Sequence, residues 1–247
     1  MSERVRPYLP DPRIRLIRNE RNCGASGCRN IAARAACGRF LSFVDSDDLL
    51  SPHYLERVSA TIEQLSNPGI VGCVRCVIDE VDEEPVVTAG AKAPEPLIST
   101  DPEDAVLDLL RGPHRYTGMT IERSVFEELG GFDEEIWMGE VFGVWVRVAV
   151  TGRAVRVIRD PIYLVRVHQL SIVGKPGRTI ELAEAHLATL RLIAQRIPLT
   201  SERRKALDVN AQRAATLLAR ARYRKAVREG DVKLARQNAR LLLWLRP

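Results

Sequence analysis

Apolar and polar positions along the chain form short strand-like runs that alternate with helical stripes. Residues 13–18 alternate basic and apolar side chains, as a half-buried strand does. Further apolar runs have the length of buried strands, at 40–44, 70–77, 116–121 and 153–158. Apolar residues at helical spacing predict helices at 28–37, 52–65, 100–110 and 124–129, with another after 134. This alternation predicts an α/β fold.

The last part of the chain has a different pattern, which is helical throughout. Three amphipathic segments predict helices at 180–197, 201–229 and 232–245. Gly230 and Asp231 separate the last two, as a turn between antiparallel helices would. We therefore expect an α/β domain over residues 1–177 and an all-helical region over 178–247.

Charge is unevenly distributed along the sequence. The whole chain carries a net charge of +5, but residues 201–247 contain 13 Lys and Arg against four Asp and Glu. No nucleic-acid-binding motif accompanies this basic segment, so we expect no nucleic-acid partner. Its cationic face is either simply solvated or a peripheral contact with anionic lipid, to which each basic residue contributes about 1 kcal/mol.

Cysteine usage and hydropathy predict a cytoplasmic protein. The five Cys are odd in number and scattered, and the CxxC of Cys73 and Cys76 lies in a strand-like run that favours packing over zinc or redox chemistry. No apolar run approaches the ~18 residues of a membrane span. If the basic helices bind lipid, we expect the protein at the inner face of the membrane.

Three acidic residues follow the predicted strand 40–44 directly. Asp45, Asp47 and Asp48 place three carboxylates at the strand's C-terminal end, the edge at which open α/β sheets bind ligands. Mg²⁺ or Mn²⁺ would relieve their mutual repulsion, since both ions prefer oxygen ligands. A solvated turn is the alternative, because Asp and Ser both favour turns. Spacing alone leaves both interpretations open.

The sequence around this acidic loop resembles the family 2 glycosyltransferases of GT-A fold. The matching motifs are Asn22-x-Gly24, Arg29-Asn30, Ala36-x-Gly38-x-Phe40 and Asp45-x-Asp47-Asp48. The resemblance implies that Asp45 and Asp47 hold the ribose and the metal of a nucleotide-sugar, with Asp47 as the metal ligand. It also places Asn22, Arg29 and Asp48 among the donor-binding candidates.

A second matching motif, GGFDE at 130–134, precedes the helix in which the family's catalytic base lies. The family has an acidic pair there, and the resemblance aligns Glu140 with its first member. Its second member, the proposed base that deprotonates the acceptor hydroxyl, falls on Val141, which cannot accept a proton. Glu140 is therefore the candidate catalytic residue. Its alternative role is structural, since the helix dipole favours an acid at this end.

A histidine after the last predicted strand completes the resemblance. His168 lies in an H-x-x-S pattern similar to the family's C-terminal metal-binding histidine, which implies a role beside Asp47 in holding Mg²⁺ or Mn²⁺. In the family, a βαβα segment with an acidic nucleotide-binding motif precedes the point at which this sequence starts. We therefore expect a GT-A-like mixed sheet flanked by helices that is incomplete at its N-terminus.

The resemblance implies a metal-dependent glycosyltransferase that moves a sugar from a nucleotide-diphosphate donor to an acceptor hydroxyl with inversion. The acceptor would be a carbohydrate or a lipid-linked molecule of polysaccharide or cell-envelope biosynthesis. Val141 and the expected N-terminal gap favour an alternative, namely a catalytically inactive glycosyltransferase-like fragment or a binding protein.

Overall fold

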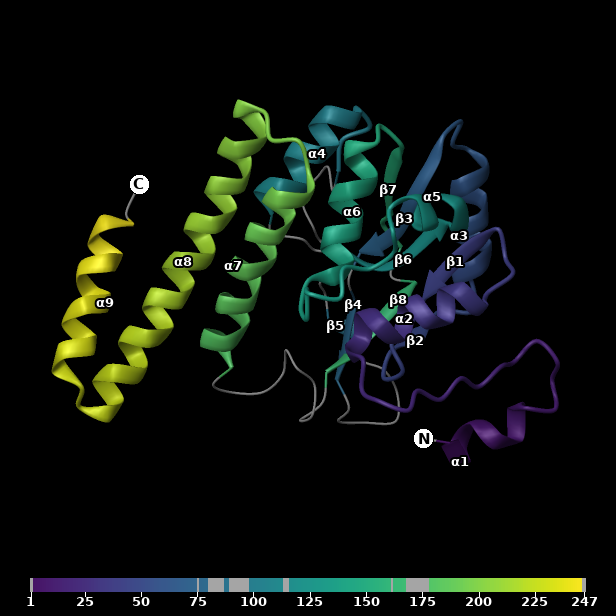
Figure 1. Cartoon of the computed structure of the whole chain (residues 1–247), viewed down its shortest axis with the longest axis horizontal. Helices are drawn as coiled ribbons and strands as arrows, with labels where there is room; N and C mark the ends of the chain where they lie inside the picture. The colour runs from purple at the N-terminus through teal and green to yellow at the C-terminus, as the bar shows by residue number, and fades with distance from the viewer. Residues whose placement is uncertain are drawn as a thin grey trace.

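The chain folds into two mixed sheets flanked by helices, and its last helices extend from one side of this α/β body (Figure 1). This arrangement confirms the predicted mixed-sheet α/β fold with C-terminal helices. The N-terminal residues form a short helix, α1 (Ser2–Val5), and a 3-10 turn, η1 (Arg6–Tyr8). The computed structural model describes residues 2–74, 76–79, 87–88, 98–112, 116–160, 162–167 and 178–245.

The first sheet has the strand order β1-β6-β3-β7. Its strands are β1 (Phe40–Phe43), β3 (Pro68–Val74), β6 (Tyr116–Glu122) and β7 (Ala154–Ile158). Strand β6 is antiparallel to both β1 and β3, whereas β3 and β7 are parallel. Strands β3 and β6 are central, and β3 is buried along almost its whole length, which explains its nearly continuous apolar sequence.

The second sheet has the order β2-β8-β4-β5. Its strands are β2 (Leu49–Leu50), β4 (Cys76–Asp79), β5 (Val87–Thr88) and β8 (Tyr163–Val167). The apolar run at 70–77, predicted as one strand, is thus divided between β3 and β4, which belong to different sheets. The run is divided because its two parts pair with different strands: β3 is parallel to β7, whereas β4 is parallel to β8.

Helices cover both faces of the first sheet and create two apolar cores. Ile70 and Trp145 lie in one core, which continues through Leu190 in the C-terminal helices. Val58 and Val71 lie in the other. Ile70 and Val71 are neighbours on opposite sides, as the alternation of side chains along a strand requires. The helices are α2 (Gly24–Ala35), α3 (Tyr54–Glu63), α4 (Pro102–Arg111), α5 (Arg123–Glu128) and α6 (Glu140–Val150).

Three helices complete the described chain, namely α7 (Thr179–Arg196), α8 (Ser201–Glu229) and α9 (Val232–Trp244). The predicted turn between α8 and α9 is confirmed, with Gly230 left-handed at φ 72° and the Asp231 carboxylate accepting from the Leu234 N–H. Helix α7 packs on α6, and α8 packs on α4. The division of the chain at 177/178 remains a prediction. Among the described residues, no helix is both long and apolar enough to cross a bilayer.

The predicted strand at residues 13–18 is wrong. This segment has no regular secondary structure, and Ile14, Leu16 and Ile17 are exposed. An alternating pattern indicates only that a strand could bury one face, whereas a strand also needs a neighbour with which to exchange hydrogen bonds. Residues 13–18 do not pair with the edge strand β1, which among the described strands pairs with β6 alone.

Two predicted helices have different boundaries in the structure. The helix predicted at 28–37 begins earlier, at Gly24, so that the whole first matching motif lies in or beside α2. The helix predicted from Pro52 begins at Tyr54. Leu55, assigned by its spacing to the buried stripe of that helix, is exposed, and Tyr54 is buried in its place. A buried tyrosine adds a large apolar surface and hydrogen-bonds its hydroxyl to Thr120.

Asn30 in α2 joins the first motif to the GGFDE turn. Its amide donates to the Phe132 carbonyl and to Glu134 Oε1, both at 3.0 Å, and its carbonyl accepts from the Phe132 N–H at 2.8 Å. Gly131 has φ 79°, and a Cβ there would lie 2.6 Å from Asn30 Oδ1. The second glycine of the turn is therefore required both by its backbone conformation and by the approach of Asn30.

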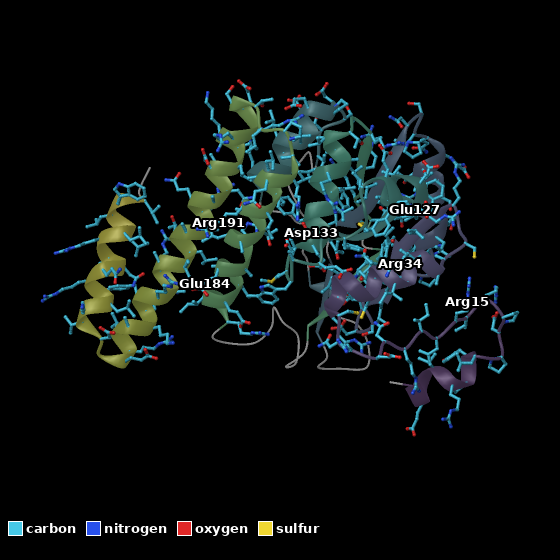
Figure 2. All side chains as sticks on the ribbon, viewed as in Figure 1. Arg15, Arg34, Glu127, Asp133, Glu184 and Arg191 are labelled. Atoms are coloured by element: carbon cyan, nitrogen blue, oxygen red, sulfur yellow. The ribbon has the colours of Figure 1, made fainter. Side chains whose placement is uncertain are left out.

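Replacing Asn30 tests this connection. We expect Asn30→Ala to lower the free energy of unfolding by about 2–4 kcal/mol, because the N–H and C=O of Phe132 lose their partner. Urea denaturation followed by circular dichroism measures the change. Arg34→Ala, on the exposed side of the same helix (Figure 2), should change stability by less than about 0.5 kcal/mol. Equal losses for the two variants would contradict the assignment.

Candidate active site

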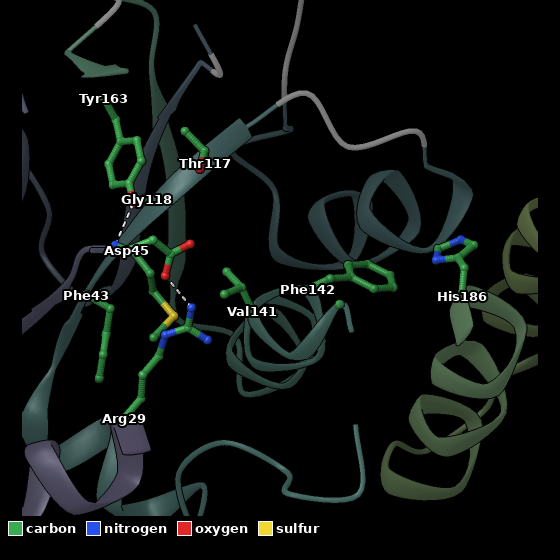
Figure 3. Close-up of a pocket in the computed structure, with 11 residues that line it drawn as sticks. Arg29, Phe43, Asp45, Thr117, Gly118, Val141, Phe142, Tyr163 and His186 are labelled. Atoms are coloured by element: carbon green, nitrogen blue, oxygen red, sulfur yellow. Dashed lines mark hydrogen bonds and ion pairs between the residues drawn. The ribbon is translucent and has the colours of Figure 1, made fainter. Parts of the chain in front are cut away.

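A cavity of about 280 Å³ opens beside the C-terminal end of β1 (Figure 3). Strand β6 is antiparallel to β1, so its N-terminal half faces the same end, and the start of α6 forms the opposite wall. The cavity is lined by Arg29, Phe43, Asp45, Thr117, Gly118, Met119, Gly139, Val141, Phe142, Tyr163 and His186. This is the place at which the sequence predicts ligand binding, after strand 40–44.

Arg29 lies at the centre of the site's charges. Its guanidinium makes two ion pairs, each at 2.5 Å, with Asp45 Oδ1 and with Glu140 Oε1. The side chains of Arg29 and Glu140 are only 17% and 14% exposed, whereas that of Asp45 is 50% exposed. Burial disfavours the charged guanidinium, but the two carboxylates outweigh it, and the pKa of Arg29 is raised. Helix α2, the acidic loop and α6 thus meet at one cation.

The acidic loop is held by a tyrosine and a backbone amide from β8. The Asp45 N–H donates to the Tyr163 hydroxyl at 3.1 Å, and Asp48 Oδ1 accepts from the Arg166 N–H at 3.0 Å. Burial, with the charges of Asp45 and Asp47, raises the pKa of Asp48 against the effect of its hydrogen bonds. The charges of Asp45 and Asp47 thus act on Asp48 in the direction that the predicted repulsion requires, and Asp45 and Asp47 are exposed whereas Asp48 is partly buried.

Glu140 and Val141 occupy different surroundings at the start of α6. Glu140 is the first residue of the helix, after a left-handed Gly139 with φ 82°, and its carboxylate is held by Arg29. Val141 lines the cavity, so the position that resembles the family's base presents methyl groups. Figure 3 shows Val141 between Asp45 and Phe142. The role of Glu140 as the catalytic base, and its alternative role as a structural acid, both stay predictions.

Asn22, which the sequence also predicts at the donor site, lies at the start of α2 and not at the cavity. Asn22 Oδ1 accepts from the Gly24 N–H at 3.0 Å, which fixes the turn into α2, but Asn22 does not line the cavity. His168 lies outside the described residues. Asn22 therefore contributes by positioning α2, in the part of the site that the structure describes.

Sequence reasoning missed His186 and Tyr163. His186, on α7, lines the cavity, and its Nε2 lies 3.0 Å from Asn210 Oδ1. Its ring centroid is 6.4 Å from that of Phe142. No local pattern marks this histidine, because only the packing of α7 against α6 brings it to the site. Tyr163 is likewise positioned by the pairing of β8 with β2, which follows the acidic loop.

Arg147 of α6 has a structural role. Arg147 donates to the backbone carbonyls of Leu129 and Gly131, at 2.8 and 2.6 Å. Burial lowers the pKa of this guanidinium. Arg147 therefore fixes the start of the GGFDE turn, and it does not line the cavity.

The acidic loop suits a metal that is shared with a ligand. Among the described residues, no three His, Cys, Asp or Glu side chains converge into a metal cage. Mg²⁺ and Mn²⁺ at phosphate sites commonly take one or two carboxylates together with phosphate oxygens and water. Asp45 lines the cavity and Asp47, two residues further on, is exposed, which fits that donor set.

Relatives of known sequence match the chain over short segments. ExoO of Rhizobium meliloti, a succinoglycan biosynthesis protein, is 48% identical over 50 residues, which cover 20% of this chain and 14% of that protein. The Escherichia coli protein WfgD, a UDP-Glc:α-D-GlcNAc-diphosphoundecaprenol β-1,3-glucosyltransferase, is 50% identical over 46 residues, covering 19% and 18%. The matched segments therefore span less than a fifth of either relative.

Solved structures match over almost the whole chain. Staphylococcus aureus TarS 1–349 in complex with UDP-GlcNAc gives a TM-score of 0.60 at 16% identity, covering 96% of this chain and 77% of that one. The mannosyltransferase PcManGT of Pyrobaculum calidifontis, in complex with GDP-Man and Mn²⁺, gives 0.58 at 16% identity, covering 96% and 64%. At this identity the likeness establishes the fold, which agrees with the expected GT-A-like architecture.

The family model described as glycosyl transferase family 2 matches residues 2–130, just over half of the chain. The match includes α2, the acidic loop and the first glycine of the GGFDE turn. It confirms the family that the sequence motifs indicate. This protein belongs to glycosyl transferase family 2.

Proposed function

We propose that this protein transfers a sugar from a nucleotide-diphosphate donor to an acceptor hydroxyl, with Mg²⁺ or Mn²⁺ at the acidic loop. One observation carries the proposal: Arg29 joins Asp45 to Glu140 at a cavity beside the strand end where α/β sheets bind ligands. Two solved proteins of the same fold support the donor class, since one is in complex with UDP-GlcNAc and the other with GDP-Man and Mn²⁺.

The residues of the acidic loop have separate roles in this proposal. Asp47 would hold the metal together with His168, and Asp45 would contact the ribose of the donor. A bound metal supplies positive charge against the diphosphate that leaves. Asp48 keeps the loop attached to β8 through the Arg166 N–H. Arg29 holds Asp45 in place from α2, so the donor meets a loop whose conformation is already fixed.

Glu140 is the proposed base. In a single displacement, the acceptor oxygen forms a bond to the anomeric carbon as the bond to the diphosphate breaks, and the hydroxyl proton passes to a carboxylate. Attack opposite the leaving group inverts the anomeric centre. Arg29 orients the Glu140 carboxylate beside the cavity. The expected acceptor is a carbohydrate or a lipid-linked molecule.

A second function, nucleotide binding without turnover, is favoured by Val141. This residue lines the cavity at the position that resembles the family's base, and it provides no group that accepts a proton. In this alternative the fold and the acidic loop are kept for binding a nucleotide, and Glu140 is only the partner of Arg29.

The metal assignment predicts nucleotide affinity. We expect UDP to bind in the presence of Mn²⁺, and Asp47→Ala to weaken that binding by at least about 10-fold, because the loop loses its exposed metal ligand. Isothermal titration calorimetry of both proteins measures this. Asp208→Ala, on the exposed side of α8, is the matched control and should bind as the unmodified protein does. Equal affinity of the Asp47 and Asp208 variants would refute the assignment.

The base assignment predicts a loss of rate without a loss of binding. We expect Glu140→Gln to reduce donor-dependent sugar transfer or donor hydrolysis by about 10²–10⁴-fold. UDP affinity should stay unchanged, since the amide oxygen still accepts from Arg29. Glu56→Gln, exposed on α3, is the control. Metal-dependent UDP binding without any turnover by the unmodified protein would instead support the non-catalytic function.

We also propose that the outer face of α9 contacts anionic lipid. Helix α9 packs on α8, and its long outer side chains point away from the body (Figure 2). Lys233, Arg236 and Arg240 of this helix are exposed, as are Leu243 and Trp244 at its end, by 63% and 80%. A helix face that combines cations with an exposed tryptophan suits a negatively charged bilayer surface. Such a contact would bring the cavity near a lipid-linked acceptor.

Vesicle binding tests this surface. We expect sedimentation with phosphatidylglycerol-containing vesicles, weakened by raised salt and reduced on the order of 100-fold when Lys233, Arg236 and Arg240 are all changed to Ala. A matched triple change of Arg18, Arg21 and Arg34, exposed in the α/β body, should have a much smaller effect. Equal binding to neutral vesicles, or equal effects of the two triple variants, would contradict the proposal.

A further inference from the structure

Two cysteine sulfurs lie side by side at the start of α2. Cys23 is the N-cap residue, and Cys28 lies in the first turns of the helix. Their Sγ atoms are 3.5 Å apart, and the Asn19 amide donates to both, at 3.1 Å to Cys23 and 3.3 Å to Cys28. A Cβ at Gly27 would lie 2.8 Å from the Cys23 Cβ, so the side chain of Cys23 packs directly over that glycine. The pair is a defined side-chain cluster.

Solvent reaches this pair of cysteines. Cys28 is exposed and Cys23 is partly exposed, whereas Cys73 is buried in the core. Cys37 is exposed too, but its described neighbour is the Arg15 guanidinium at 3.4 Å. Among the cysteine side chains that the structure describes, Cys23 and Cys28 are the two with sulfurs in contact. The function proposed above uses neither.

We propose that Cys23 and Cys28 form a reversible disulfide by exchange with a low-molecular-weight disulfide of the oxidised-glutathione class. The Cys28 thiolate, the more exposed, attacks one sulfur of the reagent, forming a mixed disulfide and releasing one thiol. The Cys23 thiolate then attacks the Cys28 sulfur and releases the second thiol. The reagent disulfide is reduced to two thiols, which take up the two cysteine protons, and the protein gains one S–S bond.

The local backbone permits this closure. A disulfide requires an S–S distance of about 2.0 Å, so the sulfurs must approach one another. Cys23 is the N-cap of α2, so that only its C=O belongs to the helical hydrogen-bond ladder, and its side chain makes no capping bond. Residues 14–22, which precede it, are exposed and have no helix or strand. Movement at Cys23 therefore breaks few interactions apart from the hydrogen bond of the Asn22 turn.

Oxidation would act on the donor side of the cavity. Cys28 precedes Arg29, and Asn22 next to Cys23 fixes the turn into α2 by accepting from the Gly24 N–H. Drawing Cys23 toward Cys28 strains this turn and shifts the helix end that positions Arg29. We expect weaker nucleotide binding in the oxidised protein. This consequence rests on the proposed function, whereas formation of the disulfide does not.

Mass spectrometry of the full chain tests the disulfide itself. The protein is equilibrated with reduced and oxidised glutathione, quenched with acid, alkylated and cut with trypsin, which releases residues 22–29 as one peptide containing both cysteines. We expect this peptide to lose two hydrogens and to recover two alkylated thiols after dithiothreitol. Cys37, on the separate peptide 35–39, should form only the glutathione adduct and reports that the reagent has reacted.

Variants and a binding measurement separate the possible outcomes. Cys28→Ser should abolish the loss of two hydrogens. A peptide 22–29 that keeps two free thiols, or carries only glutathione adducts, when Cys37 has reacted would overturn the proposal. Calorimetry with UDP and Mn²⁺ then compares oxidised and reduced protein. Equal affinities would overturn the coupling to Arg29, whereas absence of binding in the reduced protein would refute the proposed function and leave the disulfide standing.

Discussion

The site of this protein is organised by one largely buried cation, Arg29. A charge removed from water is costly unless it is paired, and here the two partners come from different elements, Asp45 after β1 and Glu140 at the start of α6. Moving any one of these elements would leave a charge without its partner. The double ion pair therefore ties α2, the acidic loop and α6 together, and the cavity is the space that they enclose with β6 and β8.

Asn30, the neighbour of Arg29 on α2, has a different role. Successive helix residues project about 100° apart, so Arg29 faces the cavity while Asn30 is buried against the GGFDE turn. Arg147 binds carbonyls of the same turn from α6. Asn30 and Arg147 thus hold the scaffold together, whereas Arg29 reaches the cavity.

The chemistry of the cavity is mixed. Its acidic edge suits a metal and a diphosphate, but Val141 and Phe142 give its α6 wall an apolar surface, with His186 beyond them (Figure 3). The proposed transfer therefore depends on whether Glu140, already engaged by Arg29, acts on an acceptor. The cysteine pair at the start of α2 is linked to this ion pair through the chain, because Cys28 directly precedes Arg29.

The sequence by itself determined the elements whose signals are local. Apolar runs of strand length predicted β1, β6 and β7, helical periodicity predicted α7, α8 and α9, and Gly230 predicted the turn between the last two. The acidic loop and the family motifs also follow from neighbouring residues alone. Periodicity reports which side of an element can be buried, and this information is present in each segment.

Tertiary structure alone decided which of these segments meet. The pattern at residues 13–18 could not reveal whether a partner strand was available, and the run at 70–77 could not reveal that β7 and β8 would divide it between two sheets. The pairing of Arg29 with Glu140 and the arrival of His186 at the cavity likewise join residues far apart in the chain. Such contacts depend on how whole helices and strands pack, a property that no local spacing encodes.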